Sequence, residues 1–232
     1  MKIDSAESLS MNRSKKAAAE KAVAHIREHM TVGLGTGSTT RFAIQILGQK
    51  VRDGFNIQGV PTSLESERLA KELNIPLLSE FEHVDLTIDG ADEVDRRGNL
   101  IKGGGGALTR EKIVAAASNQ EIIIVDETKL VQYLGRCPLP VEVLPFGWKF
   151  VQKKLQALGC EARLRKDQDR VFITDNQNYI LDCSFKRIES PAGLVQTINN
   201  LPGVVEAGLF IGLTDKVIVG HPDGQTDEID FN

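Results

Sequence analysis

The sequence predicts an α/β protein with a doubly wound, parallel, Rossmann-like sheet and a second, smaller ferredoxin-like α+β domain. Two observations carry this prediction. Up to Gly135, short apolar runs alternate with helical segments, which is the pattern of βαβ units in a parallel sheet. After Gly135 three prolines interrupt that rhythm, and a series close to β-α-β-β-α-β begins, with one additional strand.

The first domain is expected to start with an amphipathic helix over 14–29, because apolar residues recur at every fourth position from Ala18 to Met30. Residues 1 to about 11 are polar, and we expect them to be loosely held. The remaining predicted elements are, in chain order, a strand at 31–34, a helix at 39–49, a strand at 55–60, a helix at 65–73, a strand at 84–88, a helix at 109–117 and a strand at 121–125.

The smaller domain has its own predicted series. It comprises a strand at 141–144, a helix at 146–158, strands at 161–165, 171–174 and 179–185, a helix at 191–200 and a strand at 204–210. The last strands, 217–220 and 226–229, are expected to return to the first domain. The predicted division is therefore 1–133 plus 209–232 for the catalytic α/β domain and 134–208 for the small α+β domain.

Composition restricts the class of protein. A net charge of -4 provides no basic field, so neither nucleic acid nor an anionic membrane is expected as a partner. The longest aliphatic run, residues 122–125, is too short to span a bilayer. No secretory signal is visible at the N-terminus. The three cysteines form no CxxC pair, which favours reduced thiols and a cytoplasmic location.

The first candidate site is the glycine-rich turn GLGTGST, residues 33–39, between a predicted strand and a predicted helix. Amides at the start of the helix and the hydroxyls of Thr36, Ser38 and Thr39 would bind an anion, such as a monophosphate or a carboxylate. Ser38 stands where a dinucleotide-binding motif requires glycine. A P-loop is excluded because no Gly-Lys-Ser/Thr follows. The alternative interpretation is a plain tight turn.

The second candidate is the acidic segment after the strand at 84–88. Asp89 lies where a parallel strand ends, the usual place of chemistry in such folds. Asp92 follows three residues later. For Asp95, beside Arg96, we prefer a solvated acidic turn. The order of these residues does not match a calcium loop.

The third candidate is the segment KGGGGALTRE, from Lys102 to Glu111. Four consecutive glycines are costly to order, so their presence indicates that the backbone must approach another group closely. Glu111 lies in the first turn of a predicted helix, where a cap or a dipole partner is the plain alternative. Lys102 offers a cation that would stabilise an oxyanion developing next to a base.

Two further patterns bear on metal binding and substrate binding. The segment His25-Ile-Arg-Glu-His29 matches a short zinc-binding pattern, but no third ligand accompanies it, and no metal site is expected. In the segment DETK, residues 126–129, Lys129 would add positive charge for a substrate. The plain alternative is a capped turn.

GLGTGST, DGADEVD, KGGGGALTREK and DETK, in this order and spacing, resemble ribose-5-phosphate isomerase type A. The resemblance extends from about Lys15 to the C-terminus. A minor departure is Gly106, where some members have Ala. The resemblance implies interconversion of ribose 5-phosphate and ribulose 5-phosphate without metal or organic cofactor. It also implies a homodimer or homotetramer that acts in the cytoplasm.

The resemblance also implies roles for individual residues. Glu111 would be the base that moves a proton through an enediolate, and Lys102 would stabilise the enediolate oxygen. Asp89 and Asp92 would hold hydroxyls and help to open the furanose ring. The substrate-binding residues implied in addition are Thr36, Gly37, Ser38, Thr39, Gly90, Ala91, Gly103, Gly104, Gly105 and Lys129. Lys15 is a further candidate for the phosphate.

Two rival functions remain open from the sequence. A sugar-phosphate-sensing module of a transcription regulator would share the sheet and the glycine turn, although residues 1–30 offer no basic helix-turn-helix. An amino-sugar phosphate deaminase or a CoA transferase would reuse the fold. Neither rival accounts for the segment from Lys102 to Glu111.

Overall fold

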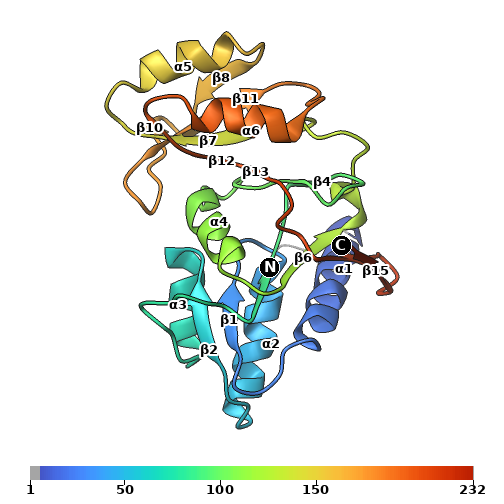
Figure 1. Ribbon diagram of the computed structural model, residues 1–232. Helices are drawn as coiled ribbons and strands as arrows, with labels where there is room; N and C mark the ends of the chain where they lie inside the picture. Colours follow the sequence, from blue (N-terminus) through green and yellow to red (C-terminus); the bar gives the residue numbers. More distant parts are fainter. Residues whose placement is uncertain (1–5, 232) are drawn as a thin grey trace. The chain divides into compact units, whose positions relative to one another are not determined.

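The computed structural model describes residues 6–231, which form two compact units (Figure 1). Within the described residues, the first unit comprises 6–90, Ile113–Leu130 and 213–231, and the second comprises Ala91–Lys112 and Val131–Gly212. One of the points at which the chain passes between the units lies within helix α4 (Leu108–Ala116). Within the described residues, no helix combines the length and the apolar character that a membrane span requires.

The first unit is built on a six-stranded sheet in the order β15-β14-β6-β3-β1-β2. Its strands are, in chain order, β1 (Thr31–Leu34), β2 (Gln58–Pro61), β3 (Leu86–Asp89), β6 (Glu121–Asp126), β14 (Lys216–Gly220) and β15 (Thr226–Asp230). All neighbouring pairs are parallel except β14 with β15. Counted within this sheet, the first five strands follow the order 2-1-3-4-5 of flavodoxin-like doubly wound folds. The predicted parallel sheet is confirmed, and the last two strands join it as expected.

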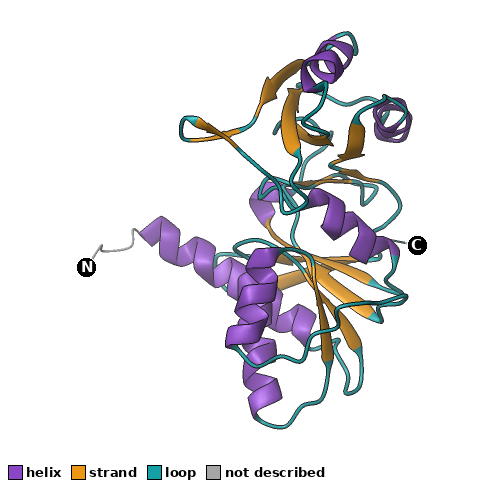
Figure 2. Ribbon diagram, turned by 90° about the vertical axis from the view of Figure 1, so that its left-hand side faces the viewer, coloured by secondary structure: helices purple, strands orange, loops and turns teal. Residues whose placement is uncertain are grey.

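Aliphatic side chains explain why this sheet forms. Every residue of β6 is buried, as in a strand covered on both faces. Helices α1 (Ala6–Val23) and α2 (Thr40–Arg52) pack side by side and against the sheet (Figure 2). Ala18 and Ala22 of α1 are fully buried in one cluster with Ile122 and Ile124, so small side chains let this helix approach β6 closely. Helix α3 (Leu64–Glu72) packs on β2 and α2.

The second unit contains a four-stranded antiparallel sheet in the order β12-β7-β11-β8. Its elements are, in chain order, β7 (Leu139–Val143), α5 (Trp148–Gln156), β8 (Glu161–Leu164), β11 (Tyr179–Ser184), α6 (Pro191–Asn199) and β12 (Val204–Ala207). This is a β-α-β-β-α-β series with the strand order 4-1-3-2, so the predicted ferredoxin-like topology is confirmed. The additional hairpin pairs β9 (Lys166–Asp167) with β10 (Arg170–Val171).

A three-stranded sheet in the second unit was not predicted. Strands β4 (Glu93–Val94) and β5 (Leu100–Ile101) form a hairpin, and β13 (Leu209–Phe210) pairs with β5. The predicted single strand at 204–210 is therefore wrong, because Gly208 divides it between two sheets. The Gly208 amide donates to Pro140 O at 2.7 Å, and its carbonyl accepts from the Lys102 amide at 2.9 Å.

Three local predictions need correction. The first helix begins at Ala6, within the segment expected to be loose, and ends at Val23 rather than at position 29. Only Arg170 and Val171 of the segment around 171–174 are in a strand, because the chain turns at Thr174, where the Gln177 amide bonds the Thr174 carbonyl.

The compact units and the predicted domains overlap over most of the chain. They differ at 91–112, 131–133 and 209–212, which the packing groups with the second unit. The predicted division into domains stays a prediction.

Candidate active site

In the first unit, the candidate residues gather where the strand order reverses. Strand β1 lies between β2 and β3, and the chain leaves β1 for β2 on one side and enters β3 on the other. In doubly wound sheets, ligands bind beyond the carboxyl ends of the strands at this position. The glycine turn follows β1, and Asp89 is the last residue of β3. The predicted anion site and the predicted aspartate are therefore at the same edge of this sheet.

The Asp89 carboxylate is held against the glycine turn. Its Oδ1 atom accepts the amide hydrogens of Thr36 at 3.0 Å and Gly90 at 2.7 Å, and the residue is fully buried. A Cβ atom on Gly35 would lie 2.3 Å from the same oxygen. Position 35 therefore has to be glycine for Asp89 to reach these amides.

The hydroxyls of the turn have several partners. Thr36 Oγ1 lies 2.8 Å from Thr62 Oγ1 and donates to Ser63 Oγ at 2.7 Å. Ser38 Oγ accepts from Lys15 Nζ at 3.0 Å, which places this lysine on the predicted anion-binding turn. The side chain of Thr39, the N-cap of α2, makes no capping bond. Thr62 and Ser63 follow β2 and were not predicted as site residues, because a serine–threonine pair after a strand has no motif of its own.

Lys129 ends the short 3₁₀ helix η1 (Glu127–Lys129), which follows β6. Strand β6 neighbours β3, so Lys129 also follows the carboxyl edge of this sheet. Its ammonium has no hydrogen bond or ion pair with any residue in the described range 6–231. The turn itself is capped by Asp126, which accepts from the Thr128 amide at 3.0 Å. The structure thus shows the capped turn, and the Lys129 ammonium is available to bind a ligand.

In the second unit, Lys102 and Glu111 form a buried pair. Lys102 Nζ lies 3.2 Å from Glu111 Oε1, and the side chains are only 2% and 6% exposed. Lys102 follows β5, and Glu111 lies in the first turn of α4. Lys102 Nζ is also 5.5 Å from the centre of the Phe210 ring, within the range of a cation–π contact. The sequence prediction that the glycine segment brings these two residues together is consistent with this geometry.

The glycine loop between them is held by side chains of the same unit. Asp92 Oδ2 accepts from the Gly104 amide at 2.8 Å, and a Cβ atom on Gly104 would lie 2.7 Å from the other carboxylate oxygen. Arg165 donates to Gly103 O at 2.9 Å and Gly104 O at 3.1 Å, while its remaining nitrogens bind Asp182. Gly104 and Gly105 are exposed, so their backbone is accessible to a ligand.

Arg165 was not identified from the sequence, because it lies about sixty residues from the loop that it binds. Asp95, by contrast, lies in the expected turn. It accepts from the amides of Arg97 and Asn99 and closes the β4–β5 hairpin. Ala91 follows Gly90 in the chain and is half-buried.

Lys112, next to Glu111, is mostly buried in the second unit. It donates to Glu206 Oε1 at 2.8 Å and to the carbonyls of Ala207 at 2.6 Å and Leu209 at 2.8 Å. Burial lowers the pKa of the Lys112 ammonium, against the opposing effect of the Glu206 carboxylate. This lysine is therefore engaged with the protein on three sides.

The histidine pattern at residues 25–29 does not form a helical pair. The helix ends at Val23, and His29 has a positive φ of 68°. His25 lies 3.5 Å from Glu228 instead. In the part of the chain that the structure describes, no three His, Cys, Asp or Glu side chains are grouped to hold a metal ion.

The fold and these residues define a class of protein. A parallel α/β sheet carries a glycine turn, the predicted anion site, and a buried aspartate at its switch point, and a buried Lys–Glu pair lies beside a glycine loop. These are the components of an α/β enzyme that transfers protons on a small anionic molecule.

Comparison with known proteins identifies the family. The family model of ribose 5-phosphate isomerase A (phosphoriboisomerase A) matches residues 58–224. The chain is 52% identical over 217 residues to ribose-5-phosphate isomerase A of Bacillus mycoides, covering 92% of this chain and 98% of that protein. Among solved structures, a D-ribose-5-phosphate isomerase in complex with phospho-erythronic acid has a TM-score of 0.91 at 42% identity, covering 95% of this chain and 99% of that one. The ribose 5-phosphate isomerase A of Methanocaldococcus jannaschii has a TM-score of 0.89 at 42% identity, covering 97% and 100%.

The chain belongs to the ribose 5-phosphate isomerase A family. It is an isomerase that interconverts D-ribose 5-phosphate and D-ribulose 5-phosphate. The resemblance drawn from its motifs is confirmed. The comparisons give no support to the alternative of a sugar-sensing module of a transcription regulator.

Proposed function

We propose that Glu111 is the base of this isomerase and that Lys102 stabilises the charge that develops on the substrate. The observation that carries the proposal is the buried pair of these two side chains, with Lys102 Nζ 3.2 Å from Glu111 Oε1. A lysine held next to a carboxylate in a site that excludes water acts strongly on a neighbouring oxyanion. A carboxylate with an ordinary pKa of about 4.3 is a weak base toward a sugar C–H, so this stabilisation is needed.

The reaction follows from these roles. Glu111 takes the proton from C2 of the open-chain aldose, and the electron pair of that C–H bond forms the C1–C2 double bond of an enediolate. The negative charge moves to O1, where Lys102 stabilises it. The proton on O2 passes to O1, and Glu111 returns its proton to C1 on the same face, giving the ketose. One carboxylate therefore serves as base and then as acid.

Asp89 and Asp92 are proposed to hold the sugar hydroxyls and to help open the furanose ring. Both are fixed by backbone amides, Asp89 by Thr36 and Gly90 and Asp92 by Gly104. Fixed carboxylates of this kind are pre-organised to accept hydroxyl hydrogens.

The proposed substrate-binding residues differ in chemistry. Backbone amides and hydroxyls of residues 36–39 suit the phosphate, and the lysines at 15 and 129 add charge. The solved relative with phospho-erythronic acid supports this. That ligand carries a phosphate, as the substrate does. The full set of proposed binding residues is Thr36, Gly37, Ser38, Thr39, Asp89, Gly90, Ala91, Asp92, Lys102, Gly103, Gly104, Gly105 and Lys129.

At the level of the cell, we propose a cytoplasmic homodimer or homotetramer that acts in the pentose phosphate pathway without a cofactor. Family membership supports the pathway. The reduced cysteines support the location, since all three are free thiols in the structure.

The test compares the wild-type enzyme with Glu111→Gln in deuterated water with a chelator present. The wild type is expected to turn over ribose 5-phosphate and to incorporate solvent deuterium at C1 of the ketose. Glu111→Gln keeps the shape of the side chain and is expected to lose about 10³-fold in kcat, within the range attributed to a general base, with an unchanged circular dichroism spectrum. A near-normal rate in this variant would remove Glu111 from the role of base.

A further inference from the structure

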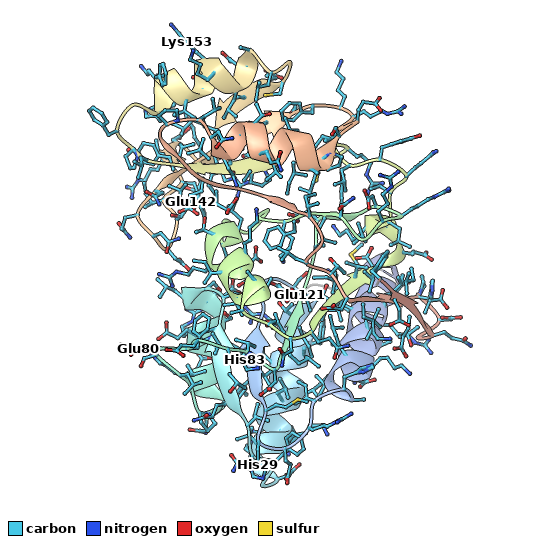
Figure 3. All side chains as sticks on the ribbon, viewed as in Figure 1. His29, Glu80, His83, Glu121, Glu142 and Lys153 are labelled. Atoms are coloured by element: carbon cyan, nitrogen blue, oxygen red, sulfur yellow. The ribbon has the colours of Figure 1, made fainter. Side chains whose placement is uncertain are left out.

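Another buried carboxylate, Glu142 on β7, lies outside the residues discussed above (Figure 3). It is fully buried. Its Oε1 atom accepts from Thr174 Oγ1 at 2.8 Å, Asn178 Nδ2 at 2.9 Å and Asn176 Nδ2 at 3.3 Å. Its Oε2 atom accepts from Thr109 Oγ1. All four donors are neutral, and all belong to the second unit.

Burying a carboxylate makes an unfavourable contribution to the stability of a fold. Taking the charge out of water costs several kcal/mol, which hydrogen bonds only partly offset. Three of the four donors come from the turn at 174–178, next to β11. The fourth, Thr109, comes from the first turn of α4 and is the sole donor to Oε2 among residues 6–231. Glu142 therefore joins that helical turn to the four-stranded sheet.

Thr109 and Glu111 are two residues apart on the same helix. The hydrogen bond from Thr109 to Glu142 therefore bears on the orientation of Glu111. Successive residues of an α-helix are rotated by about 100°, so residues two apart point to nearly opposite sides of the helix. Fixing the Thr109 side chain on Glu142 therefore sets the rotation of the helix about its axis. That rotation determines where the Glu111 carboxylate points.

The other side chains of this turn are anchored in the same unit. Arg110 donates to Asn176 Oδ1 at 2.9 Å and to Asp175 O at 3.2 Å, so it reaches the same turn that surrounds Glu142. Lys112 is engaged on the other side by Glu206 and two carbonyls. Every residue from 109 to 112 thus has a side-chain partner in the second unit, with Lys102 as the partner of Glu111.

We propose that Glu142 is a positioning residue for the isomerase reaction, acting through Thr109 on the orientation of Glu111. The proposal rests on the role of Glu111 as base. It assigns a function to the small α+β unit: its sheet and the turn at 174–178 hold the first turn of α4 in the orientation that proton transfer requires. A misplacement of about 1 Å in such a group is enough to lower a rate by about 10²-fold.

The test uses two variants that each remove one neutral donor to Glu142 and one variant that keeps the donor. Thr109→Val keeps the shape and loses the hydroxyl, Thr109→Ser keeps the hydroxyl, and Asn178→Ala removes a donor that is not on α4. We expect Thr109→Val to lower kcat about 10- to 100-fold with KM within about twofold, and Thr109→Ser to restore most of the rate. Asn178→Ala is expected to lower the melting temperature and to keep kcat within about twofold, since Oε1 retains two donors.

A second measurement separates positioning from stability. With ribose 5-phosphate deuterated at C2, a misplaced base makes proton transfer more rate-limiting, so the isotope effect on kcat is expected to rise in Thr109→Val. It should not change in Asn178→Ala. Both are measured well below the melting temperature of each variant. If Thr109→Val does not fold, Thr109→Ala replaces it, because the smaller side chain lets water reach Oε2.

Two outcomes would overturn the proposal: an unchanged kcat in Thr109→Val, or equal losses of kcat in Thr109→Val and Asn178→Ala. Either result, with Glu111→Gln inactive, would leave the base in place and remove only the positioning role. A fully active Glu111→Gln would instead remove the base itself.

Discussion

At the scale of single residues, the site depends on how closely the backbone approaches two carboxylates. Gly35 and Gly104 lie against Asp89 and Asp92, and a Cβ atom at either glycine would come within 2.3 Å and 2.7 Å of a carboxylate oxygen. In both cases the glycine makes room for a carboxylate that accepts an amide hydrogen. The glycines that the sequence presents as flexible are thus required for tight packing around charged groups.

This close approach leads to a prediction for Gly35→Ala. The added methyl group has to displace the Asp89 carboxylate, which is buried and held by two amides, so we expect a loss of about 1–3 kcal/mol in the free energy of unfolding. The isomerase activity should fall as well. Urea denaturation and steady-state kinetics measure the two effects.

Gly193→Ala is the matched control for this change. Gly193 lies in α6, and its added methyl group would meet only the flexible end of Ser190 at 3.0 Å. Alanine is favoured over glycine in a helix by about 1 kcal/mol, so this variant is expected to be neutral or more stable, with unchanged activity. Equal stability of Gly35→Ala and wild type would show that Asp89 is not confined as the structure indicates.

The residues of the site were predicted to different degrees. The motifs around Asp89, Lys102 and Glu111 are continuous in sequence, and their resemblance to a known family assigned them roles. Arg165 and Glu142 escaped prediction because their partners lie about sixty and thirty-three residues away. No local pattern marks an arginine as the partner of a distant glycine carbonyl.

At the scale of elements, long amphipathic segments and aliphatic strands were predictable because burial acts on each of them separately. The helices and the strands of the parallel sheet follow the expected order with small shifts at their ends, except for α1, which begins eight residues earlier and ends six residues earlier than predicted. The two-residue strands β4 and β5 could not be predicted, since their pairing with each other and the pairing of β5 with the distant β13, rather than their own sequence, make them strands. The break at Gly208 has the same origin, because its carbonyl is taken by Lys102.

The attachment of β15 to α1 and β14 gives a prediction about pH. Glu228 on β15 lies 2.9 Å from Lys21 and 2.8 Å from Lys216. Hydrogen bonds from Lys216 and then Lys21 lower the pKa of the Glu228 carboxyl from 4.5 to about 2. Because the folded pKa is below the unfolded value, this contribution to stability is complete above pH 4.5 and is lost as the pH falls through about 2.

We therefore expect Glu228→Gln to be less stable than wild type at pH 6 and to approach it as the pH falls from 4.5 toward 2. Unfolding by urea at a series of pH values measures the difference. Glu72→Gln is the control, because Glu72 is 63% exposed and its nitrogen–oxygen distance to Arg68 is 3.9 Å. Exposed pairs of this kind contribute little. A difference for Glu228→Gln that stays constant from pH 6 to 2 would contradict the assignment.

At the scale of the whole molecule, the proposed catalytic and binding residues are distributed along the chain in a simple way. The first unit supplies the glycine turn at 33–39 and Asp89, and the second supplies Asp92, the glycine loop and the Lys102–Glu111 pair. The segment from Asp89 to Asp92 crosses from one unit to the other in four residues. The second unit also holds Glu142, which is proposed to orient the base through Thr109.

The exposed apolar side chains of the second unit lead to the last prediction. Leu144, Phe146 and Phe150 are 47%, 92% and 54% exposed within a stretch of seven residues. Large apolar side chains gathered on a surface favour contact with another protein surface.

For the proposed homodimer or homotetramer, light scattering on the eluting protein should give twice or four times the 25.4 kDa of one chain. Phe146→Glu is expected to shift that mass toward one chain, whereas Ile229→Glu, a change at a 38% exposed residue of β15, should not. A wild-type mass of one chain at micromolar concentration would rule out the oligomer. An unchanged mass in Phe146→Glu would place the contact elsewhere on the surface.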